Sequence, residues 1–192
     1  MRSSDEYEAG HIANSVNIPF IVPFSAWITI KDGILLELPD DNELFDTLGG
    51  FGITKKSKVV IVTSVSDTYA IAAGPRVATT LKYAGVKDVS VLNGGYDKWV
   101  VEGKAVTTEV PEVAAKVFNG KIDKKIFVSI DYVGKNIGND VIIDNRDAEI
   151  YFGEVVCPFA GQAGRISTAK SLPVPDMWND DETIKVLMNL NK

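Results

Sequence analysis

The sequence is poor in the residues that most often build metal sites and histidine-based catalytic sites. It has one cysteine, Cys157, and one histidine, His11. One cysteine cannot form an internal disulfide or a cysteine-rich zinc site, and one histidine leaves little for a metal or a Ser-His-Asp triad. No apolar run approaches the roughly 20 residues that cross a bilayer, and the first residues lack the apolar core of a signal peptide. We therefore expect no metal or other cofactor, no membrane partner and a cytoplasmic location.

Basic charge is also scarce. The chain has 20 Lys and Arg residues against 26 Asp and Glu residues, which gives a net charge of −6 and an isoelectric point of about 4.9. Residues 1–107 and 108–192 each carry 10 basic and 13 acidic side chains, so neither part has the Lys- and Arg-rich stripe that binds nucleic acid. We expect no nucleic-acid partner.

An internal repeat is the strongest positive feature. The matched pairs are Arg2 and Arg146, Tyr7 and Tyr151, Gly10 and Gly164, and Pro19 and Pro173. Partners lie 144 residues apart up to the tyrosines and 154 residues apart from the glycines onward. The second copy therefore carries an insertion of ten residues, which contains Cys157. Repeats of this kind indicate related structural units.

The two copies differ in what surrounds them. A strand-like run, Val141–Asp144, precedes the second copy, whereas only Met1 precedes the first. We expect residues 1–107 to form a domain without its first strand, 108–125 a linker, and 126–192 the N-terminal part of a second domain. The chain then reads as an internal piece of a longer tandem protein. The vacant strand position suggests association with a complementary fragment, or with Val141–Asp144 of the same or a second chain.

Periodicity predicts an α/β fold with a parallel sheet. The apolar run Lys58–Thr63 is typical of a central strand buried on both faces, and Val89–Leu92 is the next strand. Between them, Thr68–Tyr83 has helical spacing, although Gly74-Pro75 could break it. A short helix is expected over Tyr96–Glu102.

The motifs resemble those of a known family, the rhodaneses, which are thiosulfate and 3-mercaptopyruvate sulfurtransferases. The early motif is Arg2, Glu6-Tyr7, Gly10-His11-Ile12, Ser15 and Ile18-Pro19-Phe20. The late motif is Val91-Leu92-Asn93-Gly94-Gly95-Tyr96-Asp97-Lys98-Trp99 with Gly103-Lys104-Ala105-Val106. The early motif recurs as Val141-Ile142-Ile143-Asp144-Asn145-Arg146, Glu149-Ile150-Tyr151 and Gly164-Arg165-Ile166. The resemblance implies a three-layer rhodanese-like domain with a central parallel sheet, followed by a partial second one.

The resemblance also implies a mechanism and a missing residue. Active family members carry sulfur as a persulfide on a cysteine directly after the central strand. The matching loop here, residues 63–68, has no cysteine and no basic residue, and Asp67 would oppose an anionic substrate. It resembles the non-catalytic first domain of tandem sulfurtransferases, in which Gly74-Pro75-Arg76 has a counterpart. We therefore predict no catalytic residue in this chain and no activity for the chain alone.

Other residues have roles that the sequence leaves open or makes structural. Arg165 stands where the family has histidine, and we expect it either to bind the sulfur-donor anion or to form a surface salt bridge. Cys157 is expected to be a loop thiol. Arg2 and Arg146 are each predicted to pair with a nearby glutamate, and His11 to bond to backbone.

Three function classes follow. The favoured one is sulfane sulfur transfer from thiosulfate or 3-mercaptopyruvate to a thiophile, with a small sulfur-donor anion and a thiol-protein acceptor as partners of the complete protein. The alternative is a non-catalytic rhodanese-like binding or regulatory module. A dual-specificity phosphatase shares the fold, but its cysteine and arginine loop has no counterpart here.

Overall fold

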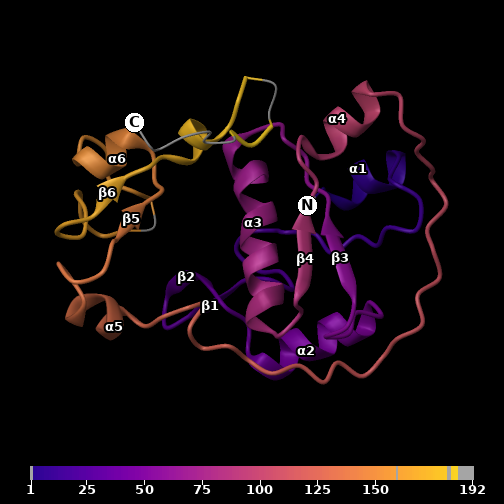
Figure 1. Cartoon of the computed structure of the whole chain (residues 1–192), viewed down its shortest axis with the longest axis horizontal. Helices are drawn as coiled ribbons and strands as arrows, with labels where there is room; N and C mark the ends of the chain where they lie inside the picture. The colour runs from indigo at the N-terminus through magenta and orange to yellow at the C-terminus, as the bar shows by residue number, and fades with distance from the viewer. Residues whose placement is uncertain (1, 159, 181–182, 186–192) are drawn as a thin grey trace. The chain divides into compact units, whose positions relative to one another are not determined.

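The computed structural model describes the chain except for Met1, Phe159, residues 181–182 and residues 186–192. The chain forms two compact units, Met1–Phe127 and Val128–Lys192, which we call unit 1 and unit 2. Figure 1 shows the elements of each unit along the chain. None of the helices in the described part is long and apolar enough to cross a membrane.

Unit 1 is an α/β unit with one buried core. Its elements are α1 (Ser4–Ala9), β1 (Thr29–Lys31), β2 (Ile34–Glu37), α2 (Asp41–Gly50), β3 (Lys58–Ile61), α3 (Thr68–Tyr83), β4 (Asp88–Val91) and α4 (Gly95–Val101). The core joins α2, β3 and α3 through Leu44, Leu48, Ile61, Val77 and Leu81, which are all buried. Burial of these side chains, each worth about 1.5–3 kcal/mol, is what holds the layers together.

Strands β3 and β4 are parallel, and α3 covers one face of the pair (Figure 1). The expectation that Gly74-Pro75 could break the helix is wrong, because α3 runs unbroken past Pro75. Gly74 lies against Thr63, where an added Cβ would be 3.0 Å from the threonine methyl carbon. Burial of Val77 and Leu81 beyond the proline offsets the roughly 3 kcal/mol that an internal proline costs a helix.

β3 is an edge strand among the described residues, contrary to its sequence pattern. In the part of the chain that the structure describes, its only ladder partner is β4, and the sheet has two strands. Val60 is 62% exposed, although the run Lys58–Thr63 predicts burial on both faces. The side of β3 away from β4 is thus open.

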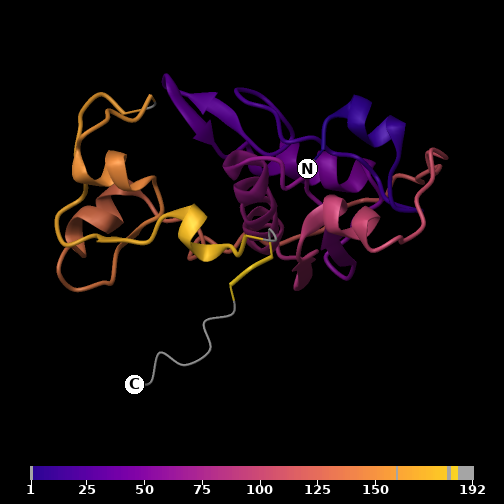
Figure 2. The same cartoon turned by 90° about the horizontal axis from the view of Figure 1, so that it is seen from above.

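A β-hairpin that sequence patterning did not predict lies between α1 and α2. Strands β1 and β2 pair antiparallel, with Asp32 and Gly33 both at positive φ in the turn. Figure 2 shows the hairpin extending from the rest of unit 1. Arg76 of α3 ties it down by donating from Nη2 to the Leu36 carbonyl oxygen at 2.9 Å.

The segment expected to be a linker, 108–125, lies along unit 1. Phe118 is buried in the core, and the Lys116 N–H donates to the Gly49 carbonyl oxygen at 2.8 Å. A Cβ on Gly49 would lie only 2.3 Å from the Lys116 carbonyl oxygen, so this close approach requires glycine. Unit 1 continues to Phe127, whose ring meets Tyr83 edge to face.

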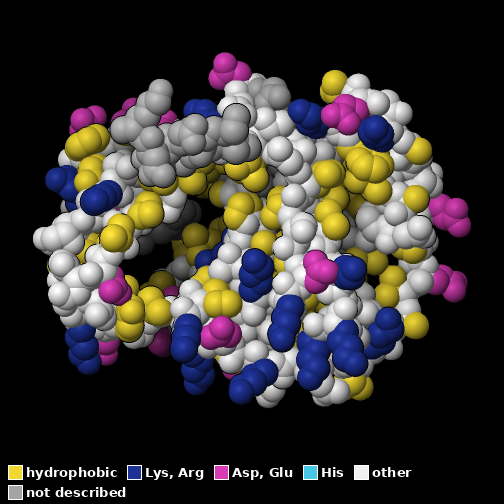
Figure 3. All heavy atoms as spheres, in the orientation of Figure 1, with side chains coloured by type: hydrophobic (Ala, Val, Ile, Leu, Met, Phe, Trp, Pro, Cys, Tyr) yellow, Lys and Arg dark blue, Asp and Glu magenta, His cyan; other side chains and the backbone are white. Residues whose placement is uncertain are grey.

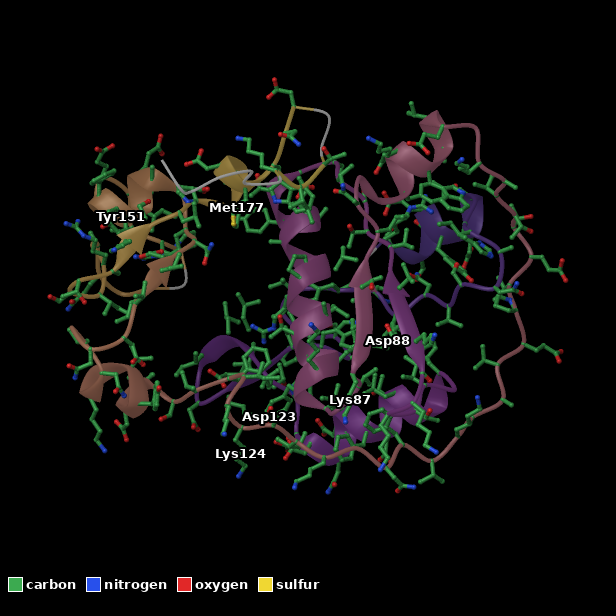
Figure 4. The ribbon with its side chains drawn as sticks, in the orientation of Figure 1. Lys87, Asp88, Asp123, Lys124, Tyr151 and Met177 are labelled. Atoms are coloured by element: carbon green, nitrogen blue, oxygen red, sulfur yellow. The ribbon has the colours of Figure 1, made fainter. Side chains whose placement is uncertain are left out.

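The end of unit 1 where β4 begins carries mixed charge. Lys and Arg side chains gather along the lower edge in Figure 3, with acidic side chains among them. Figure 4 places Lys87 and Asp88 there, with Asp123 and Lys124 close by in the view. Opposite charges alternate in both pairs, so this edge does not form a uniformly basic surface.

Unit 2 is small, and its described residues contain few buried side chains. Its elements are α5 (Ile130–Lys135), β5 (Ile143–Asp144), α6 (Ala148–Phe152), β6 (Lys170–Ser171) and a 3-10 helix (Val174–Met177). β5 and β6 are parallel, with Ile143 opposite Lys170 and Asp144 opposite Ser171. Ile143 of β5 is 51% exposed and Val141, two residues before it, is 75% exposed, so both present apolar side chains to solvent.

Candidate functional site

The loop at the carboxyl end of β3 leads from Thr63 to the N-cap of α3. Thr63, Ser64 and Val65 are buried. The start of α4 lies against this loop, because the Tyr96 N–H donates to the Thr63 carbonyl oxygen at 2.9 Å. Gly95, at φ +60°, permits the contact: a Cβ there would lie 2.5 Å from the same oxygen. The loop is thus held between β3, α3 and α4.

Asp97, in the first turn of α4, occupies the loop's hydrogen-bond donors. Its Oδ2 accepts from the Val65 N–H at 3.0 Å and from the Ser64 hydroxyl at 3.5 Å. The Ser66 N–H donates to Ser64 Oγ at 3.3 Å. The Val65 and Ser66 amides are therefore directed at oxygen atoms of the chain itself.

Asp67 adds negative charge at the same loop. It is the N-cap of α3 and accepts from the Ala70 N–H at 2.9 Å. That backbone hydrogen bond is the main cause that holds the pKa of Asp67 below its usual range. Residues 63–68 contain no Lys or Arg, and the acidic side chains Asp67 and Asp97 both lie at the loop, which disfavours an anion there.

A model of the rhodanese-like domain matches residues 1–102, more than half of the chain. The chain belongs to the rhodanese family. Thiosulfate sulfurtransferase of Gallus gallus is 31% identical over 118 residues, which cover 60% of this chain and 40% of that protein. The sulfur carrier protein TtuD of Thermus thermophilus is 30% identical over 191 residues, covering 93% of this chain and 64% of that protein. The chain thus spans less than two thirds of the length of either relative.

Solved structures agree with the rhodanese assignment. Wild-type EanB has a TM-score of 0.76 and 26% sequence identity, and the match covers 96% of this chain and 47% of that chain. A persulfide form of EanB with ergothioneine has a TM-score of 0.76 and 25% identity, over 96% of this chain and 48% of that one. The family assignment and its α/β fold, expected from the motifs, are confirmed.

The loop at 63–68 contains no cysteine. Its side chains supply hydroxyls and a carboxylate but no thiol. Cys157 lies in unit 2 after α6 and is half-buried. It follows a helix, unlike a cysteine placed directly after a central strand. In the described part of the chain, no group of three His, Cys, Asp or Glu side chains is arranged to hold a metal ion.

Arg165 lies beside a hollow in unit 2. Residues 142–146 and 160–166 contribute most of the lining of this hollow, which has a volume of about 480 Å³. The Arg165 guanidinium lies 4.5 Å from the ring centroid of Tyr151 and donates to the Tyr151 carbonyl oxygen at 3.4 Å. Arg165 is exposed and forms no ion pair among the described residues. Arg146 lines the same hollow, so two arginine residues border it.

The expected arginine–glutamate pairs do not form. Arg146 instead forms an ion pair with Asp144 at 2.5 Å, and Arg2 donates to the Gly10 carbonyl oxygen and lies 3.6 Å over the Tyr96 ring. Glu6 is engaged elsewhere, because its carboxylate completes the capping box of α1 with Ser3. That engagement is the physical reason why the prediction for Arg2 is wrong.

His11 is structural, as its sequence context predicts. It is buried, and its ring stacks on Tyr7 with 3.8 Å between centroids. Nδ1 lies 2.8 Å from the Tyr7 carbonyl oxygen and Nε2 lies 2.9 Å from that of Glu109. Both ring nitrogens therefore face backbone rather than a reacting group.

Asp97 is the site residue that sequence reasoning missed. It sits within the late family motif, where it reads as one of several polar residues of a short helix. Its contact with Val65 spans 32 residues of chain. The sequence offered one signal for this contact. Asp97 lies two positions after Gly95, the glycine at which α4 meets the loop.

Proposed function

We propose that this protein takes part in sulfane sulfur transfer from thiosulfate or 3-mercaptopyruvate to a thiophile, and that residues 1–192 supply no sulfur-carrying cysteine for it. The observation that supports this is the loop after β3, which has no thiol and whose Val65 amide is taken by Asp97. Unit 1 then has a supporting role, and the persulfide step belongs to another cysteine of the complete protein.

The chemistry explains why the loop cannot substitute for a cysteine. With thiosulfate, a cysteine thiolate attacks the sulfane sulfur, a new sulfur–sulfur bond forms, and sulfite leaves with the electron pair of the broken bond. Serine and threonine hydroxyls are not ionised near neutral pH, and Ser64 lies against the Asp97 carboxylate, which disfavours an alkoxide. No step of the transfer therefore takes place at residues 63–68.

Arg165 is the residue we propose to bind the donor anion. Its guanidinium is exposed, rests on the Tyr151 ring and borders the hollow that Arg146 also lines. A planar guanidinium suits the paired oxygens of thiosulfate or of a carboxylate. Asp144 neutralises Arg146, which leaves Arg165 to provide the net positive charge of this hollow.

Thiosulfate:cyanide sulfurtransfer is the direct test. The 192-residue chain should give no thiocyanate above the uncatalysed background, and the Cys157→Ser chain should behave identically. The complete protein should be active, and its Arg165→Gln variant should have a raised KM for thiosulfate with a smaller change in kcat. Turnover by the 192-residue chain that disappears in Cys157→Ser would overturn the proposal.

A designed thiol tests the account of the loop. Ser64→Cys should place a thiol beside Asp97, and the carboxylate should raise its pKa and slow its alkylation. Adding Asp97→Asn removes the charge, and we expect alkylation at pH 7 to be about tenfold faster than in the single variant. Adding Glu102→Gln instead is the matched control, since Glu102 lies at the far end of α4. Equal rates in all three proteins would contradict the role given to Asp97.

A further inference from the structure

His11 is the one histidine of the sequence, and sulfur transfer gives it no role. Its side chain is 2% exposed. The ring joins two segments that lie far apart in the chain. Nδ1 lies 2.8 Å from the Tyr7 carbonyl oxygen in α1, and Nε2 lies 2.9 Å from the Glu109 carbonyl oxygen. A buried, titratable side chain thus links α1 to residues 107–109, which follow α4.

Both partners of the ring are hydrogen-bond acceptors. A neutral imidazole has one N–H group and one lone pair, so it donates to one carbonyl oxygen and turns its lone pair toward the other. An imidazolium has two N–H groups and donates to both oxygens. The separations on the two sides of the His11 ring are both those of good N–H···O hydrogen bonds. The contacts of the ring are therefore complete only in its doubly protonated form.

The surroundings of the ring determine how firmly it holds this proton. His11 forms no ion pair with a carboxylate among the described residues. The Tyr7 carbonyl belongs to the last turn of α1, where the partial negative charge of a helix end favours a cation. Burial opposes the charge, and so does the Arg2 guanidinium, which bonds to the neighbouring Gly10 carbonyl oxygen. The charged and titratable residues that border the ring or the hollow beside it are Arg2, Tyr7, Lys58, Tyr96, Glu109 and Glu112. Because no carboxylate fixes the charge, the proton can be lost near neutral pH.

The backbone forms a second link to the same segment, which does not titrate. The His11 N–H donates to the Thr107 carbonyl oxygen, and the Thr107 N–H donates to the His11 carbonyl oxygen, both at 2.8 Å. The Glu109 N–H donates to Thr107 Oγ1 at 3.0 Å, and this turn brings the Glu109 carbonyl oxygen to Nε2. Loss of the ring hydrogen bond therefore loosens the segment at Glu109, and exchange of the Thr107 amide reports how often the link opens.

We propose that His11 is a proton-operated clip: its doubly protonated ring fastens residues 107–109 to α1, and loss of one ring proton releases the segment at Glu109. In the neutral ring, a lone pair facing a carbonyl oxygen replaces a hydrogen bond from a charged donor. By linkage, the closed state binds the proton more tightly than the open state, so closure is favoured at low pH and weakens as the pH rises. This inference is independent of the sulfur-transfer proposal.

Nuclear magnetic resonance of the imidazole tests the protonation state directly, because one histidine gives one set of ring signals. We would label the histidine with nitrogen-15 and titrate the 192-residue chain from about pH 5.5 to about pH 9. At about pH 7, where free histidine side chains are mostly neutral, we expect both ring nitrogens still to carry protons. One proton should then be lost at higher pH. A neutral tautomer at about pH 7, or a ring that stays doubly protonated to about pH 9, would overturn the proposal.

Amide hydrogen exchange tests the link to the segment. After correction for the intrinsic effect of pH, protection of the Thr107 amide should fall about tenfold, with the same midpoint as the ring titration. His11→Gln has a side-chain amide that stays neutral, and it should show no such step. Glu109→Gln is the matched control, since it removes a carboxylate beside the clip but keeps the carbonyl oxygen, so the step should persist.

Three results of the exchange experiment would also overturn the proposal. The first is the absence of a step at Thr107 in the natural chain. The second is a step that survives in His11→Gln, and the third is a step that disappears in Glu109→Gln, because in both cases another group would hold the proton. The ring titration of the natural chain needs no variant, so it decides the matter even where His11→Gln fails to fold.

Discussion

The segments that start at Arg2 and at Arg146 are two copies of one motif with different surroundings. In each copy, the arginine donates to the carbonyl oxygen of the glycine, Gly10 or Gly164. In each, the tyrosine hydroxyl donates to the backbone carbonyl at the following turn. In the second copy, β5 precedes the arginine and pairs with the segment after the turn, whereas residues 14–18 of the first copy form no strand.

The difference shows what a strand requires beyond its own residues. Residues 16–18 include the β-branched Val16 and Ile18, whereas the matching residues 170–172 include no β-branched residue. Nevertheless, only Lys170 and Ser171 form a strand. Partner amides and carbonyls make the distinction, since an extended segment without a ladder leaves its backbone groups to water.

The largest effect should come from removing the carboxylate that pairs with the arginine of the second copy. Asp144→Ala leaves the Arg146 guanidinium without its ion pair, which we expect to cost about 2 kcal/mol in the free energy of local opening at β6. Hydrogen exchange at the Leu172 amide measures this. Glu149→Ala, an exposed change in α6, is the control and should cost less than about 0.5 kcal/mol. Equal effects of the two variants would contradict the importance of the Asp144–Arg146 pair.

Removing the tyrosine hydroxyl in each copy tests whether the shared hydrogen bond is equivalent. Tyr7 is buried and Tyr151 half-buried. Tyr7→Phe leaves the Ser15 carbonyl oxygen without its donor and should destabilise unit 1 by about 1 kcal/mol in urea unfolding. Tyr151→Phe should cost about half as much in unit 2, because water can replace the hydroxyl there. A larger cost at Tyr151 would break the ranking.

The smallest effect should be a pH dependence confined to the second copy's ion pair. Hydrogen bonds from Arg146 hold the pKa of Asp144 below its usual range. A depressed pKa contributes stability above the unfolded-state value of about 3.9 and loses it as the pH falls through the folded-state value. Protection of the Lys170 amide should therefore weaken below about pH 4. Asp144→Asn should remove this step, and a step that persists would assign it to another carboxylate.

Sequence patterning accounts for most of the α/β core of unit 1. The run at Lys58–Thr63 became β3, two residues shorter, the run at Val89–Leu92 became β4, shifted by one residue, and the helical spacing of Thr68–Tyr83 became α3. The β1–β2 hairpin was missed, although Asp32-Gly33 between two apolar runs is a typical hairpin turn. The pattern of β3 predicted a central strand because its apolar residues favour burial on both faces, whereas β4 is its only ladder partner among the described residues.

The sequence predicted which group is absent from the candidate site, but it did not predict which side chain contacts the loop. The absence of cysteine from residues 63–68 is visible in the sequence. The contact between Asp97 and the Val65 amide depends on how α4 meets the loop, and no local pattern encodes that. Glu6 shows the same limit, since its capping role in α1 took it away from the arginine it was expected to pair with.

Intact mass after incubation with excess thiosulfate tests the central claim most directly. The account predicts that the 192-residue chain gains no sulfur atom, before or after alkylation of Cys157, because the loop after β3 offers no thiol and Cys157 does not stand after a strand. Addition of one sulfur atom that maps to Cys157 and is released by cyanide as thiocyanate would contradict it.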